Sequence, residues 1–423
     1  MVFRTAMLTT LLALLVASAA GAEQLSLRDC LEQARRDNPS LKVATHDRAV
    51  AAAEVKIAGS TRLPRIDLQG GYTAQLEPQG VKLGGTTAQT QQADYAFAGV
   101  SVYQTLYDFG RTGSRRDQAA AQVKAVSSRY GNMEQDVALQ VIRGYYAILQ
   151  DESMVQVASD EVTQREQHLQ VARNLYGEGV TTRNDLLQAE VKLSGSRQKL
   201  LAARNSLTNA WLLLNYLTGA APTRRATLVE EQTGSEPLPD AGSASLLEGR
   251  HDLKAQRAVI RAGEAAVNEV RSGFYPEIYL KAGIDYLQND KVAEQAIAGA
   301  TVGLKMNLYD GMATTGRQRQ AVDQLQREKD RLRELETAVV LEMQTARNDM
   351  DVARERIETA RDAIRQGEEN LRINQDRYQA QVGTATDVVD AQTLLSQVRS
   401  DYYQAQFDYQ VARARVLRAA GEL

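Results

Sequence analysis

The sequence predicts a mainly α-helical chain that also forms part of a membrane β-barrel and contains an internal two-fold repeat. Three observations predict this fold class. The chain begins with the pattern of a secretory signal, its two halves match one another at offsets near 200 residues, and each half places short alternating strands beside very long stretches without proline. Together they favour an exported protein that crosses a membrane with strands.

The composition favours long helices. The 423 residues include only 7 Pro, 5 Phe and 1 Trp, whereas the abundant Ala, Gln, Arg, Glu and Leu are helix formers. The formal net charge of −3 lacks the basic surplus typical of nucleic-acid-binding proteins. A nucleic-acid partner is therefore not expected.

Residues 1–22 have the pattern of a secretory signal peptide. Arg4 precedes an apolar stretch at 6–17, and small residues lead to Ala22, so cleavage is expected before Glu23. A transmembrane anchor would need about 18 apolar residues, which neither this run nor any other segment supplies. We therefore expect an exported mature chain whose membrane span uses strands.

An internal repeat divides the mature chain into residues 23–219 and 250–423, joined by a connector at 220–249. Early matches share an offset of 212 and later ones an offset of 202: Leu41 with Leu253, Pro64 with Pro276, Gly71 with Gly283, Leu106-Tyr107-Asp108 with Leu308-Tyr309-Asp310, and Asp185 with Asp387. The first copy thus holds ten extra residues, which we expect in an exposed loop at 77–92.

Each copy contains two predicted strands, at about 65–75 and 94–107 in the first and at about 277–288 and 296–309 in the second. In the last strand apolar residues at even positions from Ala298 to Leu308 alternate with mostly polar or small ones. Such alternation over about ten residues is typical of a membrane β-barrel. A half-buried sheet would explain one such strand, but four strands in two repeated hairpins of an exported chain favour the membrane.

Long helices are predicted at about 112–176, 183–218, 313–378 and 384–420. The two longest would extend roughly 100 Å at 1.5 Å per residue. In the third, apolar residues recur at near-heptad spacing, which predicts coiled-coil packing: Leu332, Leu335, Val339, Met343, Ala346, Met350, Ala353, Ile357, Ala360, Ile364 and Leu371.

Four strands are too few to close a barrel. Unpaired strand edges facing lipid would cost several kcal/mol for each unsatisfied group, and the smallest bacterial barrels use about eight strands. Several protomers must therefore share one barrel. The residues leave a dimer and a trimer open, and a cyclic trimer would supply twelve strands around a water-filled lumen.

Several segments, in order and in both copies, are similar to a known family: 25–34, 38–41, 63–66, the repeated Leu-Tyr-Asp triplets, and 382–391. Together they resemble the TolC-type outer-membrane efflux proteins, or outer membrane factors, over essentially the whole mature chain. The resemblance implies a homotrimer with a twelve-stranded barrel and a long periplasmic α-helical barrel in the outer membrane of a Gram-negative cell.

The resemblance also implies a function and partners. The chain would be the exit duct of a tripartite efflux or type I secretion system, a passive channel and not an enzyme, surrounded by outer-membrane lipid. A periplasmic adaptor (membrane fusion protein) and an inner-membrane ABC or proton-driven transporter would be its partners. Two alternatives stay open: an exported periplasmic adaptor, and a coiled-coil structural protein without a membrane barrel. The cargo stays undetermined.

A periplasmic gate is the first site that the resemblance implies, at Asp387 and Asp390, with Asp185 as the first-copy counterpart of Asp387. Three-fold symmetry would turn each position into a ring of three carboxylates that favours cations. Asp387 also follows Thr384 at a helix start, where a carboxylate equally well caps the helix. In the first copy Gln188 replaces Asp390.

The turns before these aspartates are the expected adaptor-docking surface, with Gly179, Val180, Thr181, Val382, Gly383 and Thr384 as candidates. Turn chemistry alone would also explain the glycines. No catalytic, metal or cofactor site is expected, because His46, His168 and His251 are isolated and no phosphate-binding or nucleophile motif occurs. We expect these histidines to be solvated helix residues.

Overall fold

The computed structural model describes residues 24–230 and 245–423. The predicted signal peptide at 1–22 and the middle of the predicted connector lie outside these residues. The chain divides into two compact units. We call Met1–Ala44, Gly131–Arg250 and Thr337–Leu423 the helical unit, and Thr45–Tyr130 with His251–Glu336 the strand unit.

The elements recur along the chain in the same order, and the paired helices have equal lengths. The first series is α3 (Pro39–Gly59), β2 (Arg65–Ala74), β5 (Asp94–Tyr107), α4 (Arg111–Gly177) and α5 (Arg183–Thr218), and the second is α7 (His251–Arg271), β7 (Glu277–Leu287), β8 (Ala296–Lys305), α8 (Ala313–Gln379) and α9 (Ala385–Ala420). Both α4 and α8 have 67 residues, and both α5 and α9 have 36. Shorter elements are α2 (Leu27–Asp37), β1 (Gln24–Leu25), β6 (Thr227–Leu228) and α6 (Ser245–Gly249).

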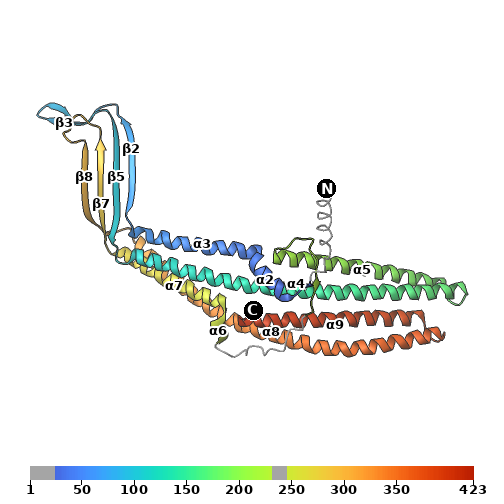
Figure 1. Cartoon of the computed structure of the whole chain (residues 1–423). Helices are drawn as coiled ribbons and strands as arrows, with labels where there is room; N and C mark the ends of the chain where they lie inside the picture. The colour runs from blue at the N-terminus through green and yellow to red at the C-terminus, as the bar shows by residue number, and fades with distance from the viewer. Residues whose placement is uncertain (1–23, 231–244) are drawn as a thin grey trace, which may run out of the picture. The chain divides into compact units, whose positions relative to one another are not determined.

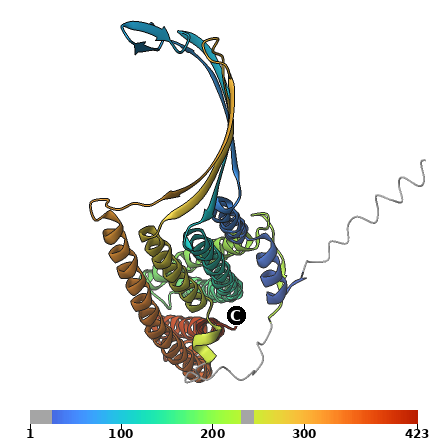
Figure 2. The ribbon, with the colours of Figure 1, turned by 90° about the vertical axis from the view of Figure 1, so that its left-hand side faces the viewer.

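A four-stranded antiparallel sheet forms the centre of the strand unit, in the order β2-β5-β7-β8. The central pairing joins the two halves of the chain, with Val100 opposite Ile284. Figure 2 shows the sheet strongly curved. Strands β2 and β8 are its outer strands, so each leaves one edge unpaired within the sheet.

The two faces of the sheet differ in polarity, because the cross-strand register aligns the alternation of all four strands. Leu68, Val100 and Ile284 stand opposite one another on one face and are 80%, 44% and 57% exposed. The other face, which we call the polar face, places Gln69 beside Gly99 and Gly99 beside Asp285. We call the first the apolar face. Its exposed Leu, Ile and Val side chains suit lipid and not water.

Two features of the strand unit differ from the expected pattern. Strand β8 ends at Lys305 and not near 309, because its partner β7 begins at Glu277, directly after Pro276, and offers no backbone beyond that point. The insertion expected as a loop folds into a hairpin of β3 (Gly80–Leu83) and β4 (Thr86–Gln89). Its two-residue turn, Gly84-Gly85, takes positive φ at both positions, as a tight hairpin turn requires.

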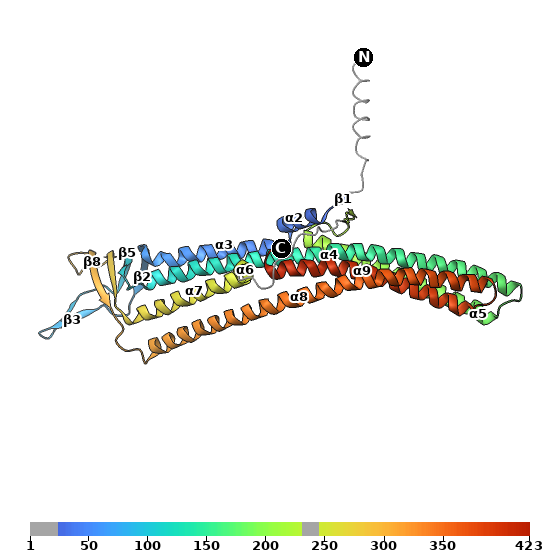
Figure 3. The ribbon, with the colours of Figure 1, turned by 90° about the horizontal axis from the view of Figure 1, so that it is seen from below.

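The helical unit is built from two helical hairpins, α4–α5 and α8–α9, which Figure 3 shows side by side. The near-heptad stripe of α8 lies inward in this unit: Met343 and Ala346 pack on Val416 and Ala419 of α9. Farther along, Leu371 packs on Val388, Ala391 and Leu395. None of the helices that the structure describes is both long and apolar enough to cross a membrane.

Candidate functional site at the tip of the helical unit

The two hairpins of the helical unit reverse direction at residues 178–182 and 380–384, which we call the first and second tip turns. Both lie at the same end of this unit (Figure 3). At each turn the second residue after the helix takes a left-handed conformation, Gly179 with φ of 76° and Gln381 with φ of 61°. The next N–H groups, of Val180 and Val382, return to the carbonyls of Leu175 and Arg377. Such hydrogen bonds to the last carbonyls, with a left-handed residue beside them, are typical of helix C-terminal ends.

A capping box starts the helix that follows each turn. The Thr182 hydroxyl accepts from the backbone N–H of Asp185 at 3.2 Å, and the Asp185 carboxylate accepts from the backbone N–H of Thr182 at 3.2 Å. The Asp387 carboxylate accepts from the backbone N–H of Thr384 at 2.9 Å in the same arrangement. Two of the predicted gate residues therefore have a structural role at a helix start.

These hydrogen bonds hold the pKa of both carboxyls below their usual value. For Asp185 the Thr181 and Thr182 hydroxyls are the main cause, and for Asp387 it is the backbone N–H of Thr384. Each bond favours the ionised form. Both side chains thus stay negatively charged at neutral pH.

Most of the remaining predicted residues are exposed at the tip. Asp390 is exposed on α9, one turn after Asp387. In the tip turns, Val180 and Val382 are 53% and 68% exposed, and Gly179 and Thr384 are exposed as well, while Thr181 and Gly383 are half-buried. The structure thus places two exposed valines at equivalent positions, where a partner protein can reach them.

A buried polar cluster behind the tip was not predicted from the sequence. The Arg165 side chain of α4 is 3% exposed and donates to Gln392 Oε1 at 2.9 Å and to Thr393 Oγ1 at 2.8 Å, both on α9. It also lies 3.7 Å from Glu161, which pairs at 3.0 Å with Lys199 of α5. Burial lowers the pKa of Arg165, and Glu161 opposes this effect. The cluster joins three helices, and the charges of Arg165 and Glu161 are largely withdrawn from water, whereas Lys199 is 60% exposed.

His168 belongs to the same buried region, so the expectation of a solvated side chain was wrong for it. The residue is 8% exposed, and its ring lies 5.8 Å from that of Tyr378 on α8. Burial and then the charge of Arg165 lower the pKa of His168. The sequence of α4 alone gives no sign of this, because Tyr378 comes from the other half of the chain.

His168 should make the helical unit less stable in acid. Because its folded-state pKa lies below the unfolded value, near 6.5, the unfolded chain binds the proton first, and stability falls as pH drops through and below that value. We expect the wild-type protein to lose more thermal stability than His168→Phe between pH 7.5 and pH 5.5. Circular dichroism melts at both pH values measure this, with His46→Phe, an exposed site, as control. Equal pH dependence of wild type and His168→Phe would contradict the assignment.

The architecture matches solved outer-membrane channels. The structure of CusC superposes with a TM-score of 0.82 at 18% sequence identity, covering 93% of this chain and 92% of that chain. VceC from Vibrio cholerae superposes with a TM-score of 0.79 at 18% identity, covering 93% of this chain and 96% of that chain. The fold is that of an outer-membrane channel.

The sequence comparison gives the family. The outer membrane protein TolC of Vibrio cholerae is 23% identical over 418 residues, which is 96% of this chain and 93% of that protein. The outer membrane efflux protein BepC of Brucella suis is 24% identical over 406 residues, 94% of this chain and 86% of that protein. The profile described as "Outer membrane efflux protein" matches residues 30–220 and 243–422.

The chain therefore belongs to the outer membrane efflux protein family. Members of this family are channels and not enzymes, and they lie in the outer membrane with an extension into the periplasm. Membership decides against the two alternatives, a periplasmic adaptor and a structural coiled coil. It confirms the family that the sequence resembled.

Proposed function

We propose that the chain is one protomer of a homotrimeric exit duct, the passive outlet of a tripartite efflux or type I secretion system. One observation supports this most directly: an open four-stranded sheet with an exposed apolar face. Unpaired backbone at β2 and β8 is too costly to face lipid. Pairing β2 of one protomer with β8 of the next satisfies both edges, and three copies give twelve strands.

The equal lengths of the paired helices and the common order of the two series of elements support an internal two-fold repeat. In a trimer, each protomer would then contribute two similar helical hairpins to a periplasmic helical barrel. An inner-membrane ABC or proton-driven transporter would supply the energy, because this chain contains no motif for using it. A periplasmic adaptor would join the two, docking on the exposed tip turns around Val180 and Val382.

We place the closed gate at the same end, with rings of Asp387 and Asp390 facing the lumen and Asp185 nearby. Asp390 is the better gate candidate, because its carboxylate has no part in a capping box, whereas those of Asp185 and Asp387 do. Three such carboxylates on one ring would attract cations and offer a site for a trivalent one. The predicted domains, 23–219 and 250–423, correspond to the two proposed repeats.

Conductance measurements in planar bilayers test the channel and its gate. Asp390→Asn removes the proposed ring without touching a helix cap, so we expect a several-fold higher open probability or conductance and weaker block by a trivalent cation such as Gd³⁺. Asp387→Asn should act in the same direction. The control is Asp376→Asn on α8, which breaks only a surface ion pair with Arg372 at 2.9 Å.

Wild-type protein that forms trimers and conducts, with an Asp390→Asn variant identical to it in conductance and block, would exclude Asp390 from the gate. A protein that remains monomeric and never conducts would exclude the proposed duct.

A further inference from the structure

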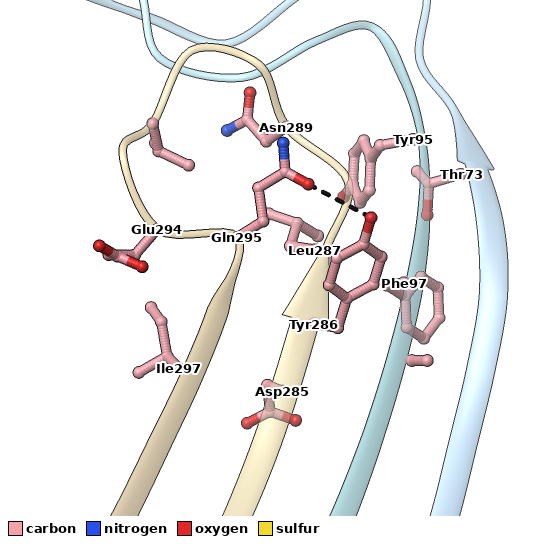
Figure 4. Close-up of a pocket in the computed structure, with 12 residues that line it drawn as sticks. Thr73, Tyr95, Phe97, Asp285, Tyr286, Leu287, Asn289, Glu294, Gln295 and Ile297 are labelled. Carbon is pink, nitrogen blue, oxygen red and sulfur yellow. Dashed lines mark hydrogen bonds between the residues drawn. The ribbon is translucent and has the colours of Figure 1, made fainter.

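A cavity of about 570 Å³ lies at the end of the sheet farthest from the helices of the strand unit. Figure 4 shows its lining. The side chains come from all four strands and from the segment between β7 and β8: Thr73, Tyr95, Phe97, Ala98, Asp285, Tyr286, Leu287, Asn289, Val292, Glu294, Gln295 and Ile297. The lining is thus mainly apolar and aromatic with two carboxylates, a composition typical of small-molecule sites.

Of the lining residues on the strands, all but Ala98 and Tyr286 lie on the polar face of the sheet. Phe97 stands opposite Leu287, and Asp285 stands opposite Ile297, so these side chains share a face. That face is opposite to the one that exposes Val100 and Ile284. In the proposed barrel the polar face would line the lumen, and the cavity would lie at the outer mouth of the duct. This location of the cavity rests on the proposed function. Tyr95, Phe97, Asp285 and Leu287 lie on the inner strands β5 and β7, whereas Ile297 lies on the outer strand β8.

Hydrogen bonds fix the wall that the β7–β8 segment contributes. Asn289 is 2% exposed and donates from Nδ2 to the carbonyl of Thr90 at 2.9 Å, while its Oδ1 accepts from the backbone N–H of Lys291 at 3.1 Å. The Tyr286 hydroxyl donates to Gln295 Oε1 at 3.2 Å, a bond drawn in Figure 4. The cavity is therefore preformed, which lowers the entropic cost of binding.

The charge of the cavity is of one sign. Asp285 and Glu294 both line it, and none of the described lining residues is a lysine or arginine. The nearby Lys291 is already paired with Asp290 at 3.5 Å. The cavity is thus lined by two carboxylates and by the rings of Tyr95 and Phe97, without a competing cation from its own lining.

We propose that this cavity is a binding site for amphipathic organic cations that carry an aromatic or alkyl group. Asp285 and Glu294 attract the positive charge, the faces of Tyr95 and Phe97 stabilise it by cation–π contact, and Leu287 and Ile297 accept the apolar part. Gly99, which faces Asp285 across the strands, leaves the space that the carboxylate occupies. Anions of the same size are excluded by the two carboxylates.

Titration calorimetry on the detergent-solubilised full chain, with benzyltriethylammonium as the probe, tests this site. We expect saturable binding to the wild type, and binding weakened about threefold to tenfold in Asp285→Asn and in Phe97→Leu. Asp290→Asn is the matched control, because it removes an equal charge from the segment directly after β7, at a residue that does not line the cavity. Tetraethylammonium, which lacks the ring, should bind more weakly, and benzenesulfonate should not bind.

Several outcomes would overturn the proposal: no binding to the folded wild type, equal binding of benzenesulfonate, or equal weakening by Asp290→Asn and Asp285→Asn. Bilayer recordings on the same preparations test the proposed duct separately from the proposed binding site. A conducting channel that does not bind the probe contradicts this site alone. A protein that binds the probe at the cavity and never conducts contradicts the proposed duct and leaves the site standing.

Discussion

Val100→Arg is expected to prevent assembly in the membrane, whereas Ser101→Arg one residue away is expected to be tolerated. Val100 lies near the middle of β5, on the apolar face, and is 44% exposed within the chain. An arginine facing lipid near the bilayer midplane costs about 2–4 kcal/mol, and a trimer would incur that cost three times. Ser101 faces the opposite way, where an arginine would meet water in the proposed lumen.

The measurement is the amount of trimer in outer-membrane fractions, detected by its resistance to SDS without boiling. We expect trimer from wild type and Ser101→Arg, and little or none from Val100→Arg. Equal assembly of both arginine variants would mean that the apolar face does not contact lipid, and it would remove the main support for the proposed barrel.

Arg165→Met is expected to destabilise the helical unit by about 3–5 kcal/mol, because losing one partner of a buried charge pair leaves the other groups unpaired. The hydrogen bonds to Gln392 and Thr393 are lost, and Glu161 keeps only Lys199. Arg173→Met is the control. It lies on the same helix, is 53% exposed, and pairs with Glu190 at 3.3 Å, an exposed contact worth about 0–1 kcal/mol.

Limited proteolysis and thermal unfolding of the solubilised protein measure the difference, and the first cleavages in Arg165→Met should fall near the tip turns. Adding Gln392→Leu to Arg165→Met should recover part of the lost stability, since an apolar pair then replaces an unsatisfied amide. If Arg165→Met and Arg173→Met unfold alike, the buried cluster does not hold the helices together.

Local chemistry made much of this structure predictable. Alternation from Ala298 onwards predicted a strand, and the structure has β8 at Ala296–Lys305. The pattern of Thr182 with Asp185, and of Thr384 with Asp387, is a capping signal, and α5 and α9 begin directly after these threonines. Such features depend on neighbours within a few residues, so they can be predicted from a single sequence.

Features that depend on distant partners were not predicted. The burial of Arg165 and His168 depends on α8 and α9, more than 200 residues away along the chain. The hairpin β3–β4 is different, since its Gly84-Gly85 turn between short alternating segments was a local signal. The expectation of a loop came instead from the general rule that insertions lie in exposed loops.

The strand order also limits the order in which the elements of this protein can pair. The helical hairpins join neighbouring segments, so each can form as soon as it emerges. Strand β5 must instead wait for β7, because Val100 pairs with Ile284 from the second half of the chain. The β2–β5 hairpin alone is only marginally stable. The four strands can therefore be joined only once the chain is available as far as Lys305, nearly three quarters of its length.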